Sequence, residues 1–169
     1  MEERGNPPEF APGAILETLV RHEVDFVLIG GIATVIRGSA RPSFDVDIAY
    51  GRDRGNLERL VHALEDLDAK LRGAPADLPV LLDAETLEQG SHFTFETRFG
   101  SLDLLHDPVG APPYAELVRG AGPSEEVEGQ ATRVASIDHL IAMKEASARP
   151  HDKVVAHELR LISDVLRAP

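Results

Sequence analysis

Two carboxylates lie one residue apart in FDVDIAY, residues 44–50, a stretch whose other residues are typical of a buried strand. Alternate strand residues point to one face, about 6.6 Å apart along the chain, so Asp45 and Asp47 project together while Val46 and Ile48 enter the core. Ionised carboxylates are costly to bury unpaired, and a bound cation would compensate them. Oxygen ligands suit Mg²⁺, which often shares them with substrate phosphates. Alone, a D-x-D string is a weak signal, because most such pairs are solvated acids.

A glycine pair precedes the acidic stretch and strengthens the signal. The apolar run Phe26–Ile29 ends at Gly30 and Gly31, after which helical spacing resumes until Gly38. Free backbone N–H groups at a helix start attract anions, and glycine permits close approach. Two glycines considered alone would indicate an ordinary strand-to-helix turn. Followed by two carboxylates, the pair predicts a phosphate cradle beside a metal site.

Hydrophobic periodicity and turn residues predict the elements that position these groups. We expect residues 1–12 to form a flexible lead-in and residues 13–169 to form a single domain. The expected helices cover residues 15–22, 32–36, 56–71, 115–118, 137–147 and 152–166. The expected strands cover residues 26–29, 43–50, 92–98, 101–106 and, at an edge, 132–136.

Composition limits the classes of function. The 169 residues contain no cysteine, which excludes disulfides and thiolate metal sites. The 17 basic and 29 acidic residues give a net charge of −12, which argues against broad attraction to nucleic acid, so that any RNA contact must be local. No apolar run is long enough to span a membrane, and the N-terminus lacks signal-peptide features, so a cytoplasmic protein is expected.

The string VLIGGIATVIRGSARPSFDVDIAY resembles the signature of the nucleotidyltransferase superfamily with the DNA polymerase β-type fold. A closer resemblance is to the AbiEii-like and MenT-like group of small bacterial nucleotidyltransferases, many of which are toxins of toxin–antitoxin pairs. The R-x-[TS]-x-D-h-D string of that group corresponds to Arg41, Ser43, Asp45 and Asp47. Its K-x(4)-R-x-x-D string corresponds to Lys144, Arg149 and Asp152.

The resemblance implies an α+β nucleotidyltransferase fold, in which a small mixed β-sheet carries the acidic site, helices flank the sheet, and C-terminal helices close the cleft. It also implies a third carboxylate on a neighbouring strand. SLDLLH supplies Asp103 between two leucines, and the alternative is a solvent-facing acid on an amphipathic strand. Asp152 is expected to cap the last helix or to pair with Arg149.

By the same resemblance, the chain would transfer a nucleoside monophosphate from an NTP to an acceptor and release pyrophosphate. Mg²⁺ or Mn²⁺ would be the cofactor, and the catalytic residues and metal ligands would be Asp45, Asp47 and Asp103. The residues expected to bind the nucleotide are Gly30, Gly31, Ser39, Arg41, Ser43, Lys144 and Arg149.

Three functional hypotheses follow. The first is a toxin-like enzyme that modifies tRNA or another macromolecule and has an antitoxin partner. The second is a nucleotidyltransferase of a small molecule such as an aminoglycoside or lincosamide, and an acidic surface suits a cationic drug. The third is a catalytically silent domain that binds nucleotide or a protein. The consumption of nucleotide separates the third hypothesis from the other two.

Overall fold

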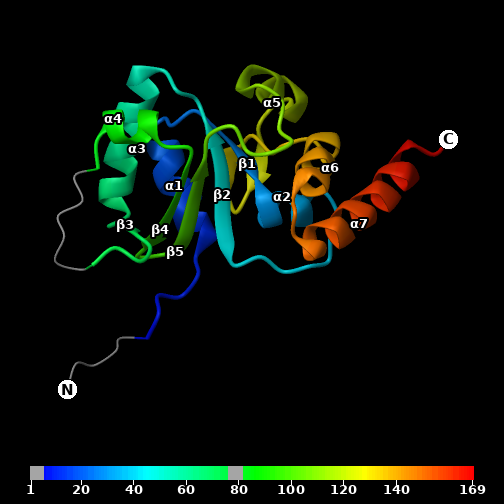
Figure 1. The fold of residues 1–169 in the computed structure, drawn as a ribbon, viewed down its shortest axis with the longest axis horizontal. Coiled ribbons are helices and arrows are strands. Elements are labelled where there is room, and N and C mark those ends of the chain that lie inside the picture. Colours follow the sequence, from blue (N-terminus) through cyan, green and yellow to red (C-terminus); the bar gives the residue numbers. More distant parts are fainter. Residues whose placement is uncertain (1–5, 76–81) are drawn as a thin grey trace.

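A five-stranded mixed sheet forms the centre of the computed structural model, which describes residues 6–75 and 82–169 (Figure 1). The helices are α1 (Pro12–Arg21), α2 (Gly30–Ile36), α3 (Arg54–Asp66), α4 (Ala84–Gln89), α5 (Tyr114–Ala121), α6 (Ile137–Ala146) and α7 (Pro150–Arg167). The strands are β1 (Phe26–Ile29), β2 (Asp45–Tyr50), β3 (Lys70–Leu71), β4 (His92–Thr97), β5 (Gly100–Leu105), β6 (Glu125–Val127) and β7 (Gln130–Thr132).

The order of the strands in the central sheet is β1-β2-β5-β4-β3, and β6 and β7 form a separate hairpin. β2 and β5 run parallel, whereas the other neighbours in the sheet are antiparallel. This arrangement of helices around a small mixed sheet confirms the predicted α+β class. In the part of the chain that the structure describes, no helix is long and apolar enough to cross a membrane.

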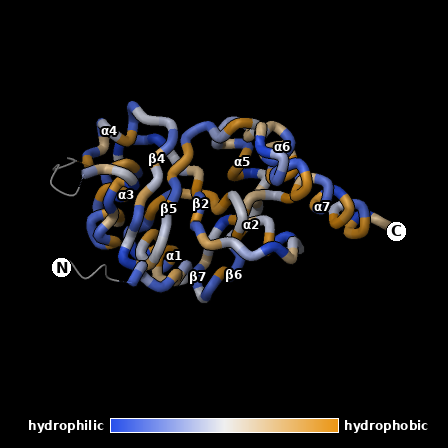
Figure 2. Tube along the Cα trace, turned by 60° about the horizontal axis from the view of Figure 1, so that its bottom comes forward, coloured by the Kyte–Doolittle hydropathy of each residue, from blue (hydrophilic) through white to orange (hydrophobic). Residues whose placement is uncertain are grey.

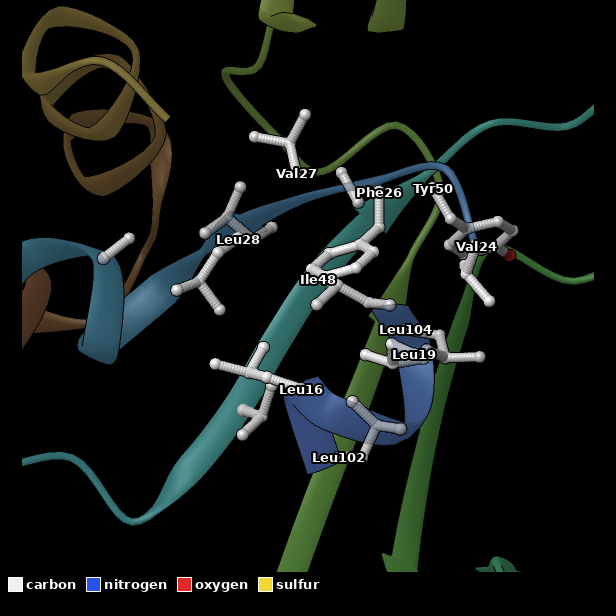
Figure 3. Packing of buried hydrophobic residues seen from close by; sticks show 14 of the residues in the cluster. Leu16, Leu19, Val24, Phe26, Val27, Leu28, Ile48, Tyr50, Leu102 and Leu104 are labelled. Carbon is white, nitrogen blue, oxygen red and sulfur yellow. The ribbon is translucent and has the colours of Figure 1, made fainter. Parts of the chain in front are cut away.

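One face of the sheet carries the apolar core. Ile48, Leu102 and Leu104 are fully buried, as are Leu16 and Leu19 of α1. Figure 3 shows that side chains from α1, β1, β2 and β5 gather in one cluster. Burial of each of these side chains contributes about 1.5–3 kcal/mol. Because strand residues alternate, this burial turns the intervening residues of β2 and β5 toward the opposite face of the sheet.

Most predicted elements are present, and the C-terminal helices α6 and α7 pack against each other (Figure 1). Along the outer half of α7, polar and apolar residues are mixed, as Figure 2 shows. α4 and β6 were not predicted. The N-terminal lead-in remains a prediction because residues 1–5 lie outside the described residues, although Ala11 N–H donates to the Phe99 carbonyl (2.9 Å).

Two predictions near the sheet edges are wrong. The helix expected over residues 56–71 ends at Asp66, because Asp68 adopts a left-handed conformation (φ 51°) and Lys70–Leu71 pair with β4. The edge strand expected over residues 132–136 is replaced by β7 and by one parallel bridge between Leu28 and Val134. That bridge still ties this segment to β1.

Candidate functional site

The acidic residues come together because β2 and β5 are parallel neighbours. Asp47 lies directly opposite Asp103 in the strand register, and Asp45 lies opposite Ser101. Opposite residues of adjacent strands point to the same face, so all three carboxylates share the face that turns away from the apolar core. The geometric expectation for Asp103 therefore holds. The catalytic and metal-binding roles of the three residues remain predictions.

The electrostatics of this group favour a bound proton or cation. Burial is the largest cause that raises the pKa of Asp47 to about 7, followed by the negative charges of Asp103 and Asp45 and a hydrogen bond with Asp103. The positive charge of Lys144 acts in the opposite direction. Burial and the charge of Asp103 also raise the pKa of Asp45. Like charges that are partly desolvated repel, and protonation or a cation relieves this repulsion.

The donor set fits a hard cation. Oδ1 of Asp103 is buried and has no hydrogen-bond partner among the described residues. Aspartate oxygens suit Mg²⁺ or Mn²⁺ better than softer metals. Within residues 6–75 and 82–169, however, no three His, Cys, Asp or Glu side chains are already gathered as a metal site. An ion would have to draw Asp45 toward the Asp47–Asp103 pair, with its remaining ligands supplied by substrate or water.

The two glycines bring the start of α2 against this group. Gly30 has a φ of +70°, and a Cβ atom there would overlap the Asp47 carboxylate. A Cβ atom on Gly31 would overlap the Ser43 hydroxyl. The glycines are therefore required for packing against Asp47 and Ser43. The turn lies against Asp47, and its use as a phosphate cradle remains a prediction.

Two of the three expected phosphate-binding cations are held by acidic residues of α7. Lys144 Nζ donates to Oδ1 of Asp152 (3.1 Å), and Arg41 Nε donates to Oε2 of Glu158 (3.2 Å). The buried Ser39 hydroxyl also bonds Glu158 (3.3 Å). The positive charge of Lys144 lowers the pKa of Asp47, whereas Arg41 is not among the groups that shift the pKa values of Asp45 and Asp47.

The expectation that Asp152 caps α7 or pairs with Arg149 is wrong. α7 begins at Pro150 with Arg149 in the N-cap position, so Asp152 lies inside the first turn. Its side chain accepts hydrogen bonds from Lys144 and from the Ser147 hydroxyl (2.5 Å). Burial alone would raise the pKa of Asp152, but these hydrogen bonds and the charges of Lys144 and Arg149 lower it.

Sequence reasoning missed the residues that border the acidic group on β3 and β4. Arg72 donates to Glu96 (2.6 Å) and to the Ser101 hydroxyl (2.7 Å), and its charge lowers the pKa of Asp45. His92 Nε2 lies 3.8 Å from Oδ2 of Asp103. The polar residues of HFTFETR carried a signal for this surface, but Arg72 followed a segment predicted as helix.

Comparison with known proteins supports the same fold. No protein-family model matches the chain, and no curated protein matches its sequence. The lincomycin-bound crystal structure of the lincosamide antibiotic adenylyltransferase LnuA is similar, with a TM-score of 0.57, 16% identity, and coverage of 92% of this chain and 99% of LnuA. ANT(2")-Ia in complex with adenylyl-2"-tobramycin gives a TM-score of 0.53 at 17% identity, covering 90% of this chain and 92% of that one.

These similarities define the class of fold. The mixed sheet and the helices around it match the nucleotidyltransferase fold of these two proteins. At identities below one fifth, the likeness concerns the fold alone.

Proposed function

We propose that the chain is a divalent-metal-dependent nucleotidyltransferase that moves a nucleoside monophosphate from an NTP to an acceptor. The observation that carries this proposal is the Asp47–Asp103 pair. Its members are opposite in register, one has a pKa raised to about 7, and the other has a buried oxygen without a partner among the described residues. Such a pair is unfavourable in the empty protein and becomes favourable around a cation.

In this proposal Asp45, Asp47 and Asp103 would hold Mg²⁺ or Mn²⁺. The cation would neutralise the negative charge that develops on the phosphoryl oxygens. The acceptor oxygen forms a bond to the α-phosphorus, the bond to the β-phosphate breaks, and pyrophosphate leaves. Asp103 would accept the proton of the acceptor hydroxyl, directly or through water.

The remaining residues would position the triphosphate. Gly30 lies against the Asp47 side chain and Gly31 lies against the Ser43 hydroxyl, so the backbone N–H groups of this turn would bind phosphate beside the acidic pair. Lys144 supplies a positive charge that acts on Asp47. The proposed nucleotide-binding set is Gly30, Gly31, Ser39, Arg41, Ser43, Lys144 and Arg149.

For the acceptor, we favour tRNA or another macromolecule, and we assign the chain to the toxin-like AbiEii and MenT group with a possible antitoxin partner. The two motif strings that end at Asp47 and at Asp152 support this assignment. A small cationic antibiotic is the second candidate, because the net charge is −12 and the similar structures named above include an aminoglycoside and a lincosamide enzyme.

Transfer of labelled nucleotide tests the proposal. The protein would be incubated with each α-labelled NTP and Mg²⁺ or Mn²⁺, together with total tRNA, an aminoglycoside or lincomycin. We expect labelled product with one acceptor class, and loss of product in Asp103→Asn but not in Asp164→Asn, an exposed carboxylate on α7. Protein that binds no NTP with either metal and transfers none would instead be the silent domain.

A further inference from the structure

The last helix, α7, holds two of the proposed phosphate contacts through two carboxylates six residues apart. Asp152 lies in its first turn and is only 8% exposed. One of its oxygens accepts from Lys144 Nζ (3.1 Å), and the other accepts from the Ser147 hydroxyl (2.5 Å). The Ser147 bond fixes the orientation of the carboxylate, and this in turn fixes the direction from which Lys144 approaches.

Glu158 lies about 9 Å further along the axis of α7 and holds the segment that leads into β2. Its carboxylate accepts from the Ser39 hydroxyl (3.3 Å), the Ala40 backbone N–H (3.3 Å) and Arg41 Nε (3.2 Å). One turn later, Ile162 packs closely against Gly38. A single face of α7 therefore fixes residues 38–41, the start of the segment that carries Ser43 and Asp45.

The two cations that these carboxylates hold keep hydrogen-bond donors available for another anion. Lys144 has three N–H donors, and its hydrogen bond to Asp152 uses one of them. Arg41 is bonded through Nε, and in the described ranges its two terminal nitrogens make no hydrogen bond. A cation that is already oriented loses less conformational entropy when it binds phosphate. The negative partner also competes with phosphate for the cation, but it engages only one nitrogen of Arg41 and one hydrogen bond of Lys144.

We infer that Asp152 and Glu158 are positioning residues for the nucleotide: Asp152 orients Lys144, and Glu158 orients Arg41 and the segment before Ser43. This inference rests on the proposed binding of an NTP by the same site. Neither carboxylate contacts the nucleotide: Asp152 acts through Lys144, and Glu158 acts through Arg41 and through its bonds to Ser39 and Ala40.

A purely structural role is the competing explanation, because Asp152 and Glu158 also attach α7 to the rest of the protein. The chain provides a matched control. Glu145 of α6 bonds Arg160 of α7. This exposed pair joins α6 to α7, as the Lys144–Asp152 pair does, without touching Lys144 or Arg41. Glu145→Gln weakens the attachment of α7 and leaves both cations in place.

Calorimetric titration with Mg·NTP tests the inference. We expect Asp152→Asn and Glu158→Ala each to raise the Kd by about tenfold, with Glu145→Gln unchanged. Two double-mutant cycles then separate positioning from structure. Once Lys144→Ala has removed the lysine, Asp152→Asn should have no further effect on Kd. In an Arg41→Ala background, Glu158→Ala should have a smaller effect than in the wild type, because only its bonds to Ser39 and Ala40 remain to be lost.

The outcomes are distinct. If the wild type binds Mg·NTP and either variant binds as tightly or more tightly, or if the effects multiply in the double mutants, the positioning role is overturned and the proposed function stands. If the wild type binds no NTP, the proposed function fails, and the inference fails with it. Loss of affinity in Glu145→Gln equal to that in Asp152→Asn would assign Asp152 a structural role.

Discussion

At the scale of single residues, the clearest feature is an aspartate that the fold holds in an unfavourable charged state. Asp47 has an ordinary pKa of 3.8 and a folded-state pKa of about 7. The folded protein therefore binds this proton more tightly than the unfolded chain does. The free energy of unfolding should fall as the pH rises from about 4 to about 7, and the full destabilisation is present above that range.

Asp47→Asn tests this destabilisation. We expect the variant without metal to be more stable than the wild type by about 1–2 kcal/mol at pH 8 and equal to it near pH 4, because the wild-type side chain is then protonated. Urea titrations at pH 4, 6 and 8 measure the difference, with Asp164→Asn as the control. A loss of stability that is the same at every pH would show that Asp47 serves the structure rather than a cation site.

Gly30 provides a second test at this scale. Gly30 and Gly73 both have positive φ angles (+70° and +78°). A new methyl group at Gly30 would overlap the Asp47 side chain, whereas one at Gly73 would meet no atom of the residues that the structure describes. Gly73→Ala should cost about 1 kcal/mol for the backbone conformation alone. Gly30→Ala should cost about 2–4 kcal/mol, because Asp47 must also move. Equal losses in denaturant titrations would mean that the turn and Asp47 are not in close contact.

The residue scale also shows how far sequence can reach. The D-x-D spacing was enough to predict that Asp45 and Asp47 share one sheet face, because strand alternation is a local rule, whereas the place of Asp103 beside them was implied by the family resemblance. The partners of the cations were not predictable in this way. Glu158 meets Arg41 across 117 positions of sequence, and only the packing of α7 brings them together. Asp152 was expected to bond a sequence neighbour, and it instead contacts Lys144 on the preceding helix.

At the scale of elements, a buried asparagine at the start of α3 links the ends of β1 and β2 through hydrogen bonds. Asn56 is fully buried; it accepts from the Asp25 N–H (2.7 Å) and donates to the Asp25 (3.0 Å) and Gly51 (2.7 Å) carbonyls. These bonds join the residue before β1 to the residue after β2. The hydrophobic period of α3 was visible in the sequence, but this polar clamp was not, because its partners lie at the ends of other elements.

Asn56→Ala tests the clamp. It removes the partners of the Asp25 N–H and the Gly51 carbonyl, while the Asp25 carbonyl keeps its bond from the Gly51 N–H (3.1 Å), and we expect a loss of about 2–4 kcal/mol in the free energy of unfolding. The control is Asp53→Ala, which removes the N-cap bond to the Asn56 N–H (2.9 Å) at the same helix start and should cost about 1 kcal/mol. An equal effect of the two changes would indicate that water replaces the lost partners of Asn56.

A predicted helix end was wrong where the backbone conformation of one residue ended a helix that the hydrophobic periodicity extended. The apolar spacing of α3 continues beyond Asp66, but the left-handed Asp68 ends the helix and lets Lys70–Leu71 join the sheet. This short strand matters for the site because it places Arg72 next to Ser101 and Glu96. A helix over the same residues would have carried Arg72 elsewhere.

At the scale of the whole molecule, the net charge of −12 limits how RNA could be the acceptor. Such a protein repels the phosphate backbone over most of its surface, so an RNA acceptor must be bound through a few local cations. Arg149 lies exposed in the N-cap position of α7, and Arg41 is half-exposed on the segment before β2. These two arginines are the candidates for such local contacts.

Binding of tRNA as a function of salt distinguishes the acceptor classes. If only two or three phosphates are contacted, the logarithm of the association constant should fall with the logarithm of salt concentration with a slope of about −2, because each phosphate contributes about 0.7–0.9. Anisotropy titrations between low and moderate KCl measure this slope, and Arg149→Glu should reduce its magnitude by about one. A slope several times steeper would contradict local binding. Absence of tRNA binding, combined with salt-sensitive binding of an aminoglycoside, would favour the small cationic acceptor, whose positive charge the acidic surface attracts.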